Sequence, residues 1–597
     1  MPNILTNLNP IQQQAVVEKN GRILILAGAG SGKTRVLTYK VAYLISQGVS
    51  PGEILMVTFT NKAAGEMKKR VWELLGNHID LPFMGTFHSF CAQILRKIGG
   101  SAGIEPNYLI FDQSDSLSLI KKILRDLNLE KSKPGAIQHA ISSAKNELLT
   151  PEKYSVFAND FFTKIVARVY SEYQKRLKVN NALDFDDLIF KTCEILENFP
   201  KVAKIYQQRF KYVLIDEYQD VNLAQYKFSK LISSYHKNLT VVGDAAQAIY
   251  GFRGADFRNI LNFSKDFPDT KVFNLEQNYR SSKKILTAAN AIISKNTSHP
   301  TLNLWTQNSD GEEIKLIENL NEIDEAETIV NIILNSNLPL SSFAVLYRTN
   351  AQSRVLEEQF LKYSIPYILV GGVRFYDRKE VKDAISYLRY SLNPADEVAL
   401  GRIIKLGKRR FEKFTQNLKK IDLDQNTVDL LNSLLIASQY LLLIDDGTEV
   451  GQERVENVKE LLSLAQNYPD PQNFLQNVAL TESESRPLKK LGLDFSEAVV
   501  LSTVHAAKGL EFETVFIIGM EEGLFPHSRS LIDPTEIEEE RRLAYVGVTR
   551  AKEKLILLFC RQRLFLGQRD FSTISRFILD IPENLLLKLT SASINQA

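Results

Sequence analysis

Short apolar runs recur along this chain, and each of them ends in small or polar residues. Residues 23–26, 54–57, 212–215 and 239–242 have the length and composition of buried strands. Between the first two runs, residues 36–44 carry apolar side chains at the spacing of a helix. This alternation predicts an α/β fold, in which ligands bind beyond the ends of the strands.

The first run leads into a turn of small residues, 27–32, which is followed by Lys33 and Thr34. Glycines in such a turn let backbone N–H groups close around phosphate oxygens, and a helix that begins near Gly32 adds its positive dipole end. Lys33 can reach the β- and γ-phosphates, and the Thr34 hydroxyl can ligate Mg²⁺. Ala27 stands where the general pattern has its first glycine. The segment predicts a nucleotide-binding P-loop rather than a turn with a chance lysine.

Two acids follow the apolar run 212–215 directly. Asp216 is placed to hold Mg²⁺, and Glu217 is placed to orient and deprotonate an attacking water. A hydrolase is favoured over a phosphotransferase because the second acid has an obvious role with water.

Three segments set aromatic side chains among hydroxyls, amides or cations: residues 58–64, 85–89 and 243–255. Phe59 and Phe87 could pack in the core, or they could stack on bases, which is a sequence-tolerant way to hold single strands. In the third segment Gln247 could sense a γ-phosphate. The same segment ends in a stacking and phosphate-contact cluster made of Tyr250, Phe252 and Arg253.

Residues 108–181 have a helical pattern that predicts an insertion, and an acidic cluster at 184–187 follows it. This cluster could be a metal site, but a capped helix start is the favoured interpretation. Near the N-terminus, Asn9 and Pro10 predict the cap and first turn of another helix. In that helix Gln12 is either a surface glutamine or a reader of an adenine edge.

The composition is that of an ordinary folded protein, with 44% hydrophobic residues in 597, and this length predicts several domains. The net charge of +3 means that any nucleic-acid site must come from local placement. Cys91, Cys193 and Cys560 are scattered, which argues against disulfides and zinc. The sequence has no signal-peptide pattern and no apolar stretch long enough for a bilayer, so we expect a soluble, intracellular protein.

Later motifs complete a pattern that resembles the UvrD/Rep/PcrA type of superfamily 1 DNA helicases over roughly residues 8–582. They are Leu-Glu-Gln-Asn-Tyr-Arg-Ser at 275–281, Tyr-Arg-Thr-Asn-Ala-Gln-Ser-Arg at 347–354, Thr-Val-His-Ala-Ala-Lys-Gly-Leu-Glu-Phe at 503–512 and the segment 538–551. The resemblance implies two RecA-like P-loop motor domains, each with an inserted, mainly helical subdomain. The first motor domain would comprise 1–108 and 185–281, its insertion 109–184, the second motor domain 282–372 and 499–582, its shortened insertion 373–498, and a short tail 583–597.

The resemblance also implies an ATP site with Mg²⁺. Its catalytic residues would be Lys33, Asp216, Glu217, Gln247, Arg280 and Arg550, and its metal ligands Thr34 and Asp216. Adenine would lie among Gln12, Arg35 and Tyr279, and the ribose near Glu511. The cofactor-binding set is completed by Ala27, Gly28, Ala29, Gly30, Ser31, Gly32, Lys33 and Thr34.

For DNA, the resemblance implies a single-strand track with a hairpin aromatic that abuts the duplex. The residues assigned to it are Phe59, Thr86, His88, Phe185, Tyr250, Phe252, Arg253, His527 and Phe565. Phe252 stands where relatives usually have tryptophan, and Ala246 and Ala248 replace an acidic residue and a serine. Residues 402–411, at the entry of the second insertion, lack the expected Gly-Ile-Gly after their basic pair.

The expected function is that of an ATP-dependent 3′–5′ translocase and helicase in DNA repair, replication restart or recombination control. The alternative is an ATP-switched DNA-binding regulator that displaces proteins from DNA with little processive unwinding. The expected partners are single-stranded and partly duplex DNA, with repair or replication proteins. We expect no membrane partner, a monomer or weak dimer on DNA, and a bacterial cytoplasm as the location.

Overall fold

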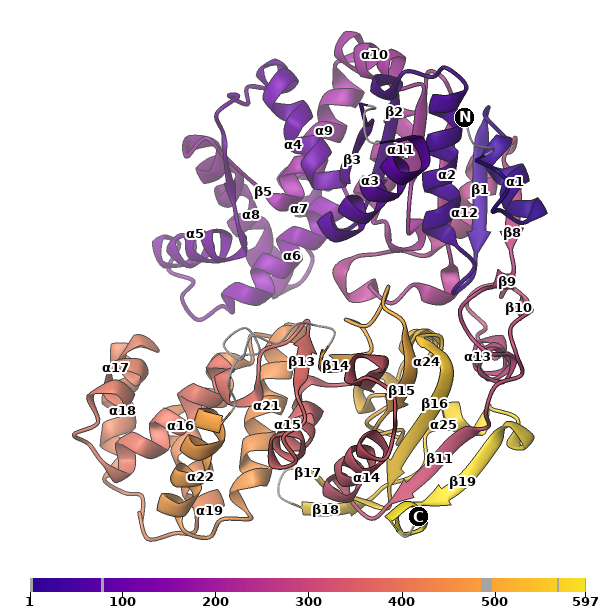
Figure 1. Ribbon diagram of the computed structural model, residues 1–597. Coiled ribbons are helices and arrows are strands. Elements are labelled where there is room, and N and C mark those ends of the chain that lie inside the picture. Colours follow the sequence, from indigo (N-terminus) through magenta and orange to yellow (C-terminus); the bar gives the residue numbers. More distant parts are fainter. Residues whose placement is uncertain (1–3, 77–79, 485–496, 566–567, 596–597) are drawn as a thin grey trace. The chain divides into compact units, whose positions relative to one another are not determined.

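The computed structural model describes residues 4–76, 80–484, 497–565 and 568–595, and these form two compact units (Figure 1). The first unit contains residues 1–279 and 299–307, and the second contains 280–298 and 308–597. The chain therefore leaves the first unit between Tyr279 and Arg280 and returns to it briefly. The predicted motor-domain boundary at 281 falls close to this point.

The first unit is built on a parallel sheet with the strand order β3-β2-β6-β7-β1-β8. Its central strands correspond to the four apolar runs of the sequence. The strands are β1 (Arg22–Ala27), β2 (Ile54–Thr58), β3 (Phe83–Thr86), β6 (Tyr212–Ile215), β7 (Leu239–Gly243) and β8 (Lys271–Leu275). Helices α1 (Pro10–Val17), α2 (Lys33–Ser46), α3 (Asn61–Leu75), α4 (Phe87–Ile98), α11 (Leu223–Ile232) and α12 (Arg258–Asp266) complete this part. The predicted α/β fold is confirmed.

The predicted helical insertion consists of α5 (Gln113–Asp126), α6 (Pro134–Asn146), α7 (Pro151–Phe157) and α8 (Phe161–Val179). A short parallel pair, β4 (Leu109–Phe111) and β5 (Ala182–Asp184), joins the start of the insertion to its end. After it, α9 (Phe185–Asn198) and α10 (Pro200–Arg209) lead into β6. The insertion has its own core, in which Ile120, Ile141, Val166 and Tyr170 are buried.

The second unit repeats the design with a seven-stranded parallel sheet in the order β13-β14-β12-β15-β16-β11-β19. Its strands are β11 (Ile314–Asn319), β12 (Phe343–Tyr347), β13 (Tyr367–Val370), β14 (Val499–Thr503), β15 (Phe512–Ile517), β16 (Ala551–Cys560) and β19 (Leu586–Thr590). Helices α13 (Lys283–Ser294), α14 (Glu322–Leu334), α15 (Ser353–Lys362) and α24 (Pro534–Val548) belong to this unit, with the short helices α25 (Arg576–Leu579) and α26 (Ser591–Asn595).

Between β13 and β14 the second unit carries a second set of helices with a separate apolar core. They are α16 (Lys379–Leu392), α17 (Glu397–Lys405), α18 (Lys408–Leu418), α19 (Thr427–Ser438), α20 (Tyr440–Ile444), α21 (Glu449–Ala465) and α22 (Pro471–Glu484). A hairpin of β17 (Gln562–Phe565) and β18 (Gln568–Phe571) follows β16. Among the described residues, none of the helices is both long and apolar enough to cross a membrane.

Candidate active site

The predicted P-loop joins β1 to α2 as a tight turn. Gly30 and Gly32 have φ angles of +65° and +89°, a left-handed conformation that glycine adopts without steric cost. At Gly28 an added Cβ would lie 2.3 Å from the Leu304 side chain, so a larger residue here would require Leu304 to move. The Lys33 Nζ donates to the Ala27 carbonyl at 2.9 Å. The loop thus presents backbone N–H groups at the start of α2, as phosphate binding requires.

Thr34 and Asp216 lie side by side where β1 and β6 end. The Thr34 hydroxyl donates to Asp216 Oδ2 at 3.2 Å. Burial, and after it the neighbouring Glu217 carboxylate, raise the pKa of Asp216 to about 7. A buried carboxylate short of positive charge, beside a hydroxyl oxygen, is a hard-oxygen donor set that suits Mg²⁺.

Glu217 adopts an unusual backbone conformation, with φ +51° and ψ +44°. A non-glycine residue in this left-handed region carries strain of about 1–3 kcal/mol, and such strain gathers at active sites. Its side chain is held from two residues away, because the Gln219 amide nitrogen donates to Glu217 Oε2 at 2.5 Å. The predicted catalytic base is therefore oriented before any substrate arrives.

Gln219, which the sequence did not single out, joins the Glu217 carboxylate to the turn after β7. The Gln219 side-chain oxygen Oε1 accepts from the Asp244 N–H at 2.9 Å, and the whole side chain is buried. Asp244 Oδ2 in turn accepts from the Gln247 amide at 2.6 Å. A continuous hydrogen-bonded path thus runs from Glu217 through Gln219 and Asp244 to Gln247, the residue predicted to sense the γ-phosphate.

The residues predicted to surround adenine lie together beside the P-loop. Gln12 is buried rather than a surface glutamine, and its amide nitrogen donates to the Ser31 carbonyl at 2.9 Å. Asn9 caps α1 as predicted and donates to the Tyr279 hydroxyl at 2.8 Å. The Tyr279 N–H donates to the Gly30 carbonyl at 3.0 Å, and its ring is 44% exposed. Arg35, at the start of α2, donates to the Asn7 carbonyl.

In the second unit, Arg280 and Arg550 converge on a single residue, Thr549. Arg280 Nη1 donates to the Thr549 carbonyl at 3.0 Å, and Arg550 Nη2 donates to its hydroxyl at 3.1 Å. Glu511 accepts from Arg280 Nε at 2.8 Å and pairs with Lys552. Two cations from motifs about 270 residues apart are thereby held as one cluster in this unit.

The aromatic residues predicted to hold DNA differ in exposure. Phe185 and Phe252 are 51% and 40% exposed, as a stacking surface requires. Phe252 lies edge-on to half-buried Tyr250, with ring centroids 6.1 Å apart. Phe59 is also half-buried and packs on the core residue Phe87.

Two polar members of the predicted track have structural roles as well. Thr86 is buried and caps α4, because its hydroxyl accepts from the Ser89 N–H. His88 lies edge-on to Phe185, with ring centroids 5.8 Å apart, and burial lowers the pKa of its imidazole. The side chain of Arg253 lies outside the described residues.

The acidic cluster at 184–187 forms a capped helix start. Asp184 is the N-cap of α9 and shares a capping box with Asp187. Lys145, from α6, lies 2.6 Å from Asp184 and 2.9 Å from Asp187, so a lysine occupies the place that a cation would take. The favoured interpretation of this segment is confirmed.

Comparison with known proteins agrees with this arrangement. The UvrD/REP helicase N-terminal domain matches residues 8–268, and the UvrD-like helicase C-terminal domain matches residues 273–449 and 409–562. This chain belongs to the UvrD/REP helicase family. ATP-dependent DNA helicase PcrA of Bacillus subtilis (strain 168) is 43% identical over 98% of this chain and 87% of its own length. PcrA of Staphylococcus aureus (strain Mu50 / ATCC 700699) is 42% identical over 98% of this chain and 88% of its own length.

The departures of this UvrD-family chain from the expected third motif lie inside the protein. Ala246 and Ala248 are 5% exposed each and flank Gln247, which is also buried. The Ala246 N–H donates to Asp244 Oδ1. Alanine therefore keeps the turn compact here, but it offers no polar side-chain group at these two positions.

His527 lies against the second insertion. Its Nε2 is 3.4 Å from Glu456 of α21, and its side chain is 12% exposed. The His527 N–H donates to Glu540, which also forms an ion pair with Arg348. The structure thus gives this predicted DNA contact a structural role between α21 of the insertion and α24.

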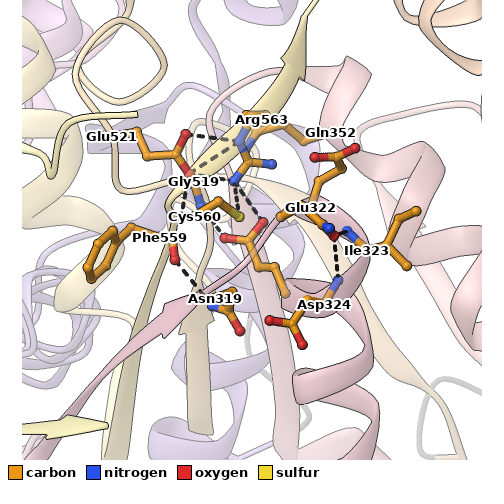
Figure 2. A network of polar contacts seen from close by, with 12 residues as sticks. Asn319, Glu322, Ile323, Asp324, Gln352, Gly519, Glu521, Phe559, Cys560 and Arg563 are labelled. Carbon is orange, nitrogen blue, oxygen red and sulfur yellow. Dashed lines mark hydrogen bonds and ion pairs between the residues drawn. The ribbon is translucent and has the colours of Figure 1, made fainter. Parts of the chain in front are cut away.

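A buried ion-pair network anchors the first strand, β17, of the hairpin that contains Phe565 (Figure 2). Arg563 donates to Glu521 at 2.6 Å and to Glu325 at 2.9 Å, and it lies 3.2 Å from Cys560 Sγ. Within the described part of the chain, Glu325, Glu521 and Cys560 are the one group of three His, Cys, Asp or Glu side chains close enough together to share a metal ion. The Arg563 guanidinium supplies the positive charge beside these residues. The side chain of Phe565 itself lies outside the described residues.

Proposed function

We propose that this protein is an ATP-dependent DNA helicase that moves 3′ to 5′ along single-stranded DNA. The observation that carries the proposal is the alignment of Lys33, Thr34, Asp216 and an oriented Glu217 at the end of one sheet. Membership of the UvrD family supports it, because the relatives are named ATP-dependent DNA helicases.

The chemistry follows from these groups. Glu217 accepts the proton of the attacking water, and Lys33 stabilises negative charge on the phosphates. Mg²⁺, held by Thr34 and Asp216, would neutralise phosphate charge when it is bound. Gln12, Arg35 and Tyr279 would bind adenine, with Glu511 toward the ribose.

We assign the contact with the transferring γ-phosphate to Gln247 in the first unit and to Arg280 and Arg550 in the second. Arginines that stabilise this charge raise hydrolysis rates by about 10³–10⁵-fold. Hydrolysis would then require residues from both units, so each ATP turnover would be coupled to a motion of one unit against the other.

The exposed rings of Phe185 and Phe252, together with Phe59, Tyr250 and Arg253, would form a sequence-tolerant track for bases. Thr86, His88, His527 and the Phe565 hairpin complete the proposed DNA contacts. We place the protein in a bacterial cytoplasm, as a monomer or weak dimer on DNA in repair, replication restart or recombination control.

The second candidate is an ATP-switched regulator that displaces proteins from DNA with little unwinding. Ala246 and Ala248 favour it, because the motif that relays ATP state to DNA grip lacks its usual polar side chains.

Substrates with a 3′ or a 5′ single-stranded tail separate these functions. The helicase unwinds a duplex from the 3′ tail and displaces streptavidin from a biotinylated 5′ end of single-stranded DNA. The regulator displaces bound protein but does not unwind. Unwinding without any translocation would contradict the motor mechanism.

A further inference from the structure

The last turn of α6 carries two adjacent polar residues, Lys145 and Asn146, that point to different parts of the first unit. Helix α6 belongs to the insertion, and it contacts α8 and α9 on one hand and α11 on the other (Figure 1). Lys145 is 1% exposed, whereas Asn146 is half-buried. Neither residue is part of the ATP site or of the DNA track proposed above.

Lys145 fixes the start of α9. It forms ion pairs with Asp184 and Asp187, and the Tyr173 hydroxyl donates to Asp184 at 3.0 Å. Burial alone would lower the pKa of Lys145, but the attraction of the two carboxylates outweighs it and raises that pKa. Phe185, the exposed ring of the proposed track, follows Asp184 directly. Its position is therefore tied to α6.

Asn146 is hydrogen-bonded to the segment that follows Asp216 and Glu217 in the sequence. Its Oδ1 accepts from Asn222 Nδ2 at 2.8 Å. Asn222 caps α11 and follows Val221, whose carbonyl accepts from the Asp256 N–H at 3.1 Å. Asn222 is five residues after Glu217 in the sequence.

The same side chain also lies beside the aromatic turn. A Cβ added at Gly254 would lie 3.8 Å from Asn146 Nδ2, so the Asn146 side chain lies near the glycine that ends the turn of Phe252. One asparagine thus accepts a hydrogen bond from the segment that follows Glu217 and lies near the turn that carries a proposed DNA-stacking ring.

We infer that Asn146 is a positioning residue that couples DNA binding to ATP hydrolysis, with Lys145 anchoring it on the DNA side. DNA bases that stack on Phe185 and Phe252 would shift the positions of α9 and of the turn that carries Phe252. Lys145 would pass this shift from α9 to α6, and Asn146 would pass it to Asn222 and, along the backbone, to the Glu217 segment. The inference rests on the proposed DNA-dependent ATPase.

The test uses the full-length chain and measures steady-state ATPase with and without oligo(dT), beside binding of fluorescent oligo(dT). Asn146→Ala removes the acceptor at a helical position where alanine is well tolerated. Asn146→Asp keeps a carboxylate oxygen that Asn222 can still bond. Asn159→Ala changes an exposed asparagine of the same insertion and is the matched control.

In Asn146→Ala we expect unchanged basal turnover, unchanged oligo(dT) affinity and a melting temperature lowered by no more than about 2–4 °C. Its DNA-stimulated kcat is expected to fall about fivefold, the effect of one hydrogen bond of about 1 kcal/mol. Asn146→Asp is expected to stay within about twofold of the wild type, because it restores the bond.

Two results overturn the inference while leaving the proposed function intact. One is full DNA stimulation in Asn146→Ala, and the other is an equal loss in Asn146→Asp and Asn146→Ala. A wild-type protein whose ATPase ignores oligo(dT) contradicts the proposed function itself, before any variant is compared.

Discussion

At the scale of single residues, the central feature is a carboxylate held in place by an amide. Glu217 has a left-handed backbone conformation, and the Gln219 amide donates to its carboxylate. The same Gln219 side chain accepts from the Asp244 N–H, in the turn that carries Gln247. Gly243 allows this, because an added Cβ there would lie 2.6 Å from the Gln219 amide oxygen. The base and the proposed γ-phosphate sensor are thereby connected by hydrogen bonds between protein groups.

Gln219→Ala is expected to lower kcat for ATP about tenfold and to leave KM nearly unchanged. The variant removes a bond to a charged group, worth about 1.5–3 kcal/mol, that orients Glu217 without contacting ATP. Steady-state ATPase measurements test this, with Gln208→Ala, an exposed glutamine on α10, as the control. A rise in KM at constant kcat would show that Gln219 serves binding instead.

Phe252→Ala is expected to weaken oligo(dT) binding about tenfold, because stacking on one base contributes about 1–3 kcal/mol. Phe252→Trp restores a larger ring and is expected to bind at least as tightly as the wild type. Fluorescence anisotropy gives the affinities, and Tyr235→Ala, which removes another exposed ring of the first unit, is the control. Equal oligo(dT) affinity in Phe252→Ala and the wild type would show that Phe252 does not contribute to DNA binding.

Sequence patterns located the P-loop, Asp216 and Glu217 because each directly follows an apolar run. The sequence did not predict a role for Gln219 or Thr549, because their roles depend on partners that are distant in sequence. Gln219 bonds the Asp244 N–H across the sheet, and Thr549 is where Arg280 and Arg550 meet. Such pairings depend on strand order, which local periodicity does not encode.

At the scale of elements, polar clusters hold the added pieces on the motor sheets. Lys145 joins α6 to α9 in the first unit, and Arg563 joins the β17–β18 hairpin to α14 in the second. The pair β4 and β5 was not predicted, because three-residue strands inside a helical stretch leave no period-2 signal. The main strands and helices were predictable because their apolar patterns are long enough to read.

Arg563→Met is expected to lower the thermal unfolding midpoint, because it leaves two buried carboxylates, Glu325 and Glu521, without a counter-charge. Breaking a buried pair in this way costs about 3–5 kcal/mol. Arg561→Met is the control, since its pair with Glu318 is exposed and is worth about 0–1 kcal/mol. Calorimetry compares the two variants, and equal midpoints would show that the network does not stabilise the hairpin.

At the scale of the whole molecule, the proposed catalytic groups are divided between two units. Lys33, Asp216, Glu217 and Gln247 belong to the first unit, and Arg280 and Arg550 belong to the second. The chain passes from one to the other between Tyr279 and Arg280, so a single motif supplies an adenine contact to one unit and a cation to the other. In the proposed mechanism, each turnover therefore depends on residues of both units.

The most direct test of that mechanism is the steady-state ATPase rate with and without single-stranded DNA, measured for the wild type and for Glu217→Gln. We predict strong stimulation by DNA in the wild type. In Glu217→Gln we predict a loss of about 10²–10⁴-fold, the usual contribution of a general base, with ATP binding retained. An ATPase that is indifferent to DNA, or one that survives Glu217→Gln, would contradict the account.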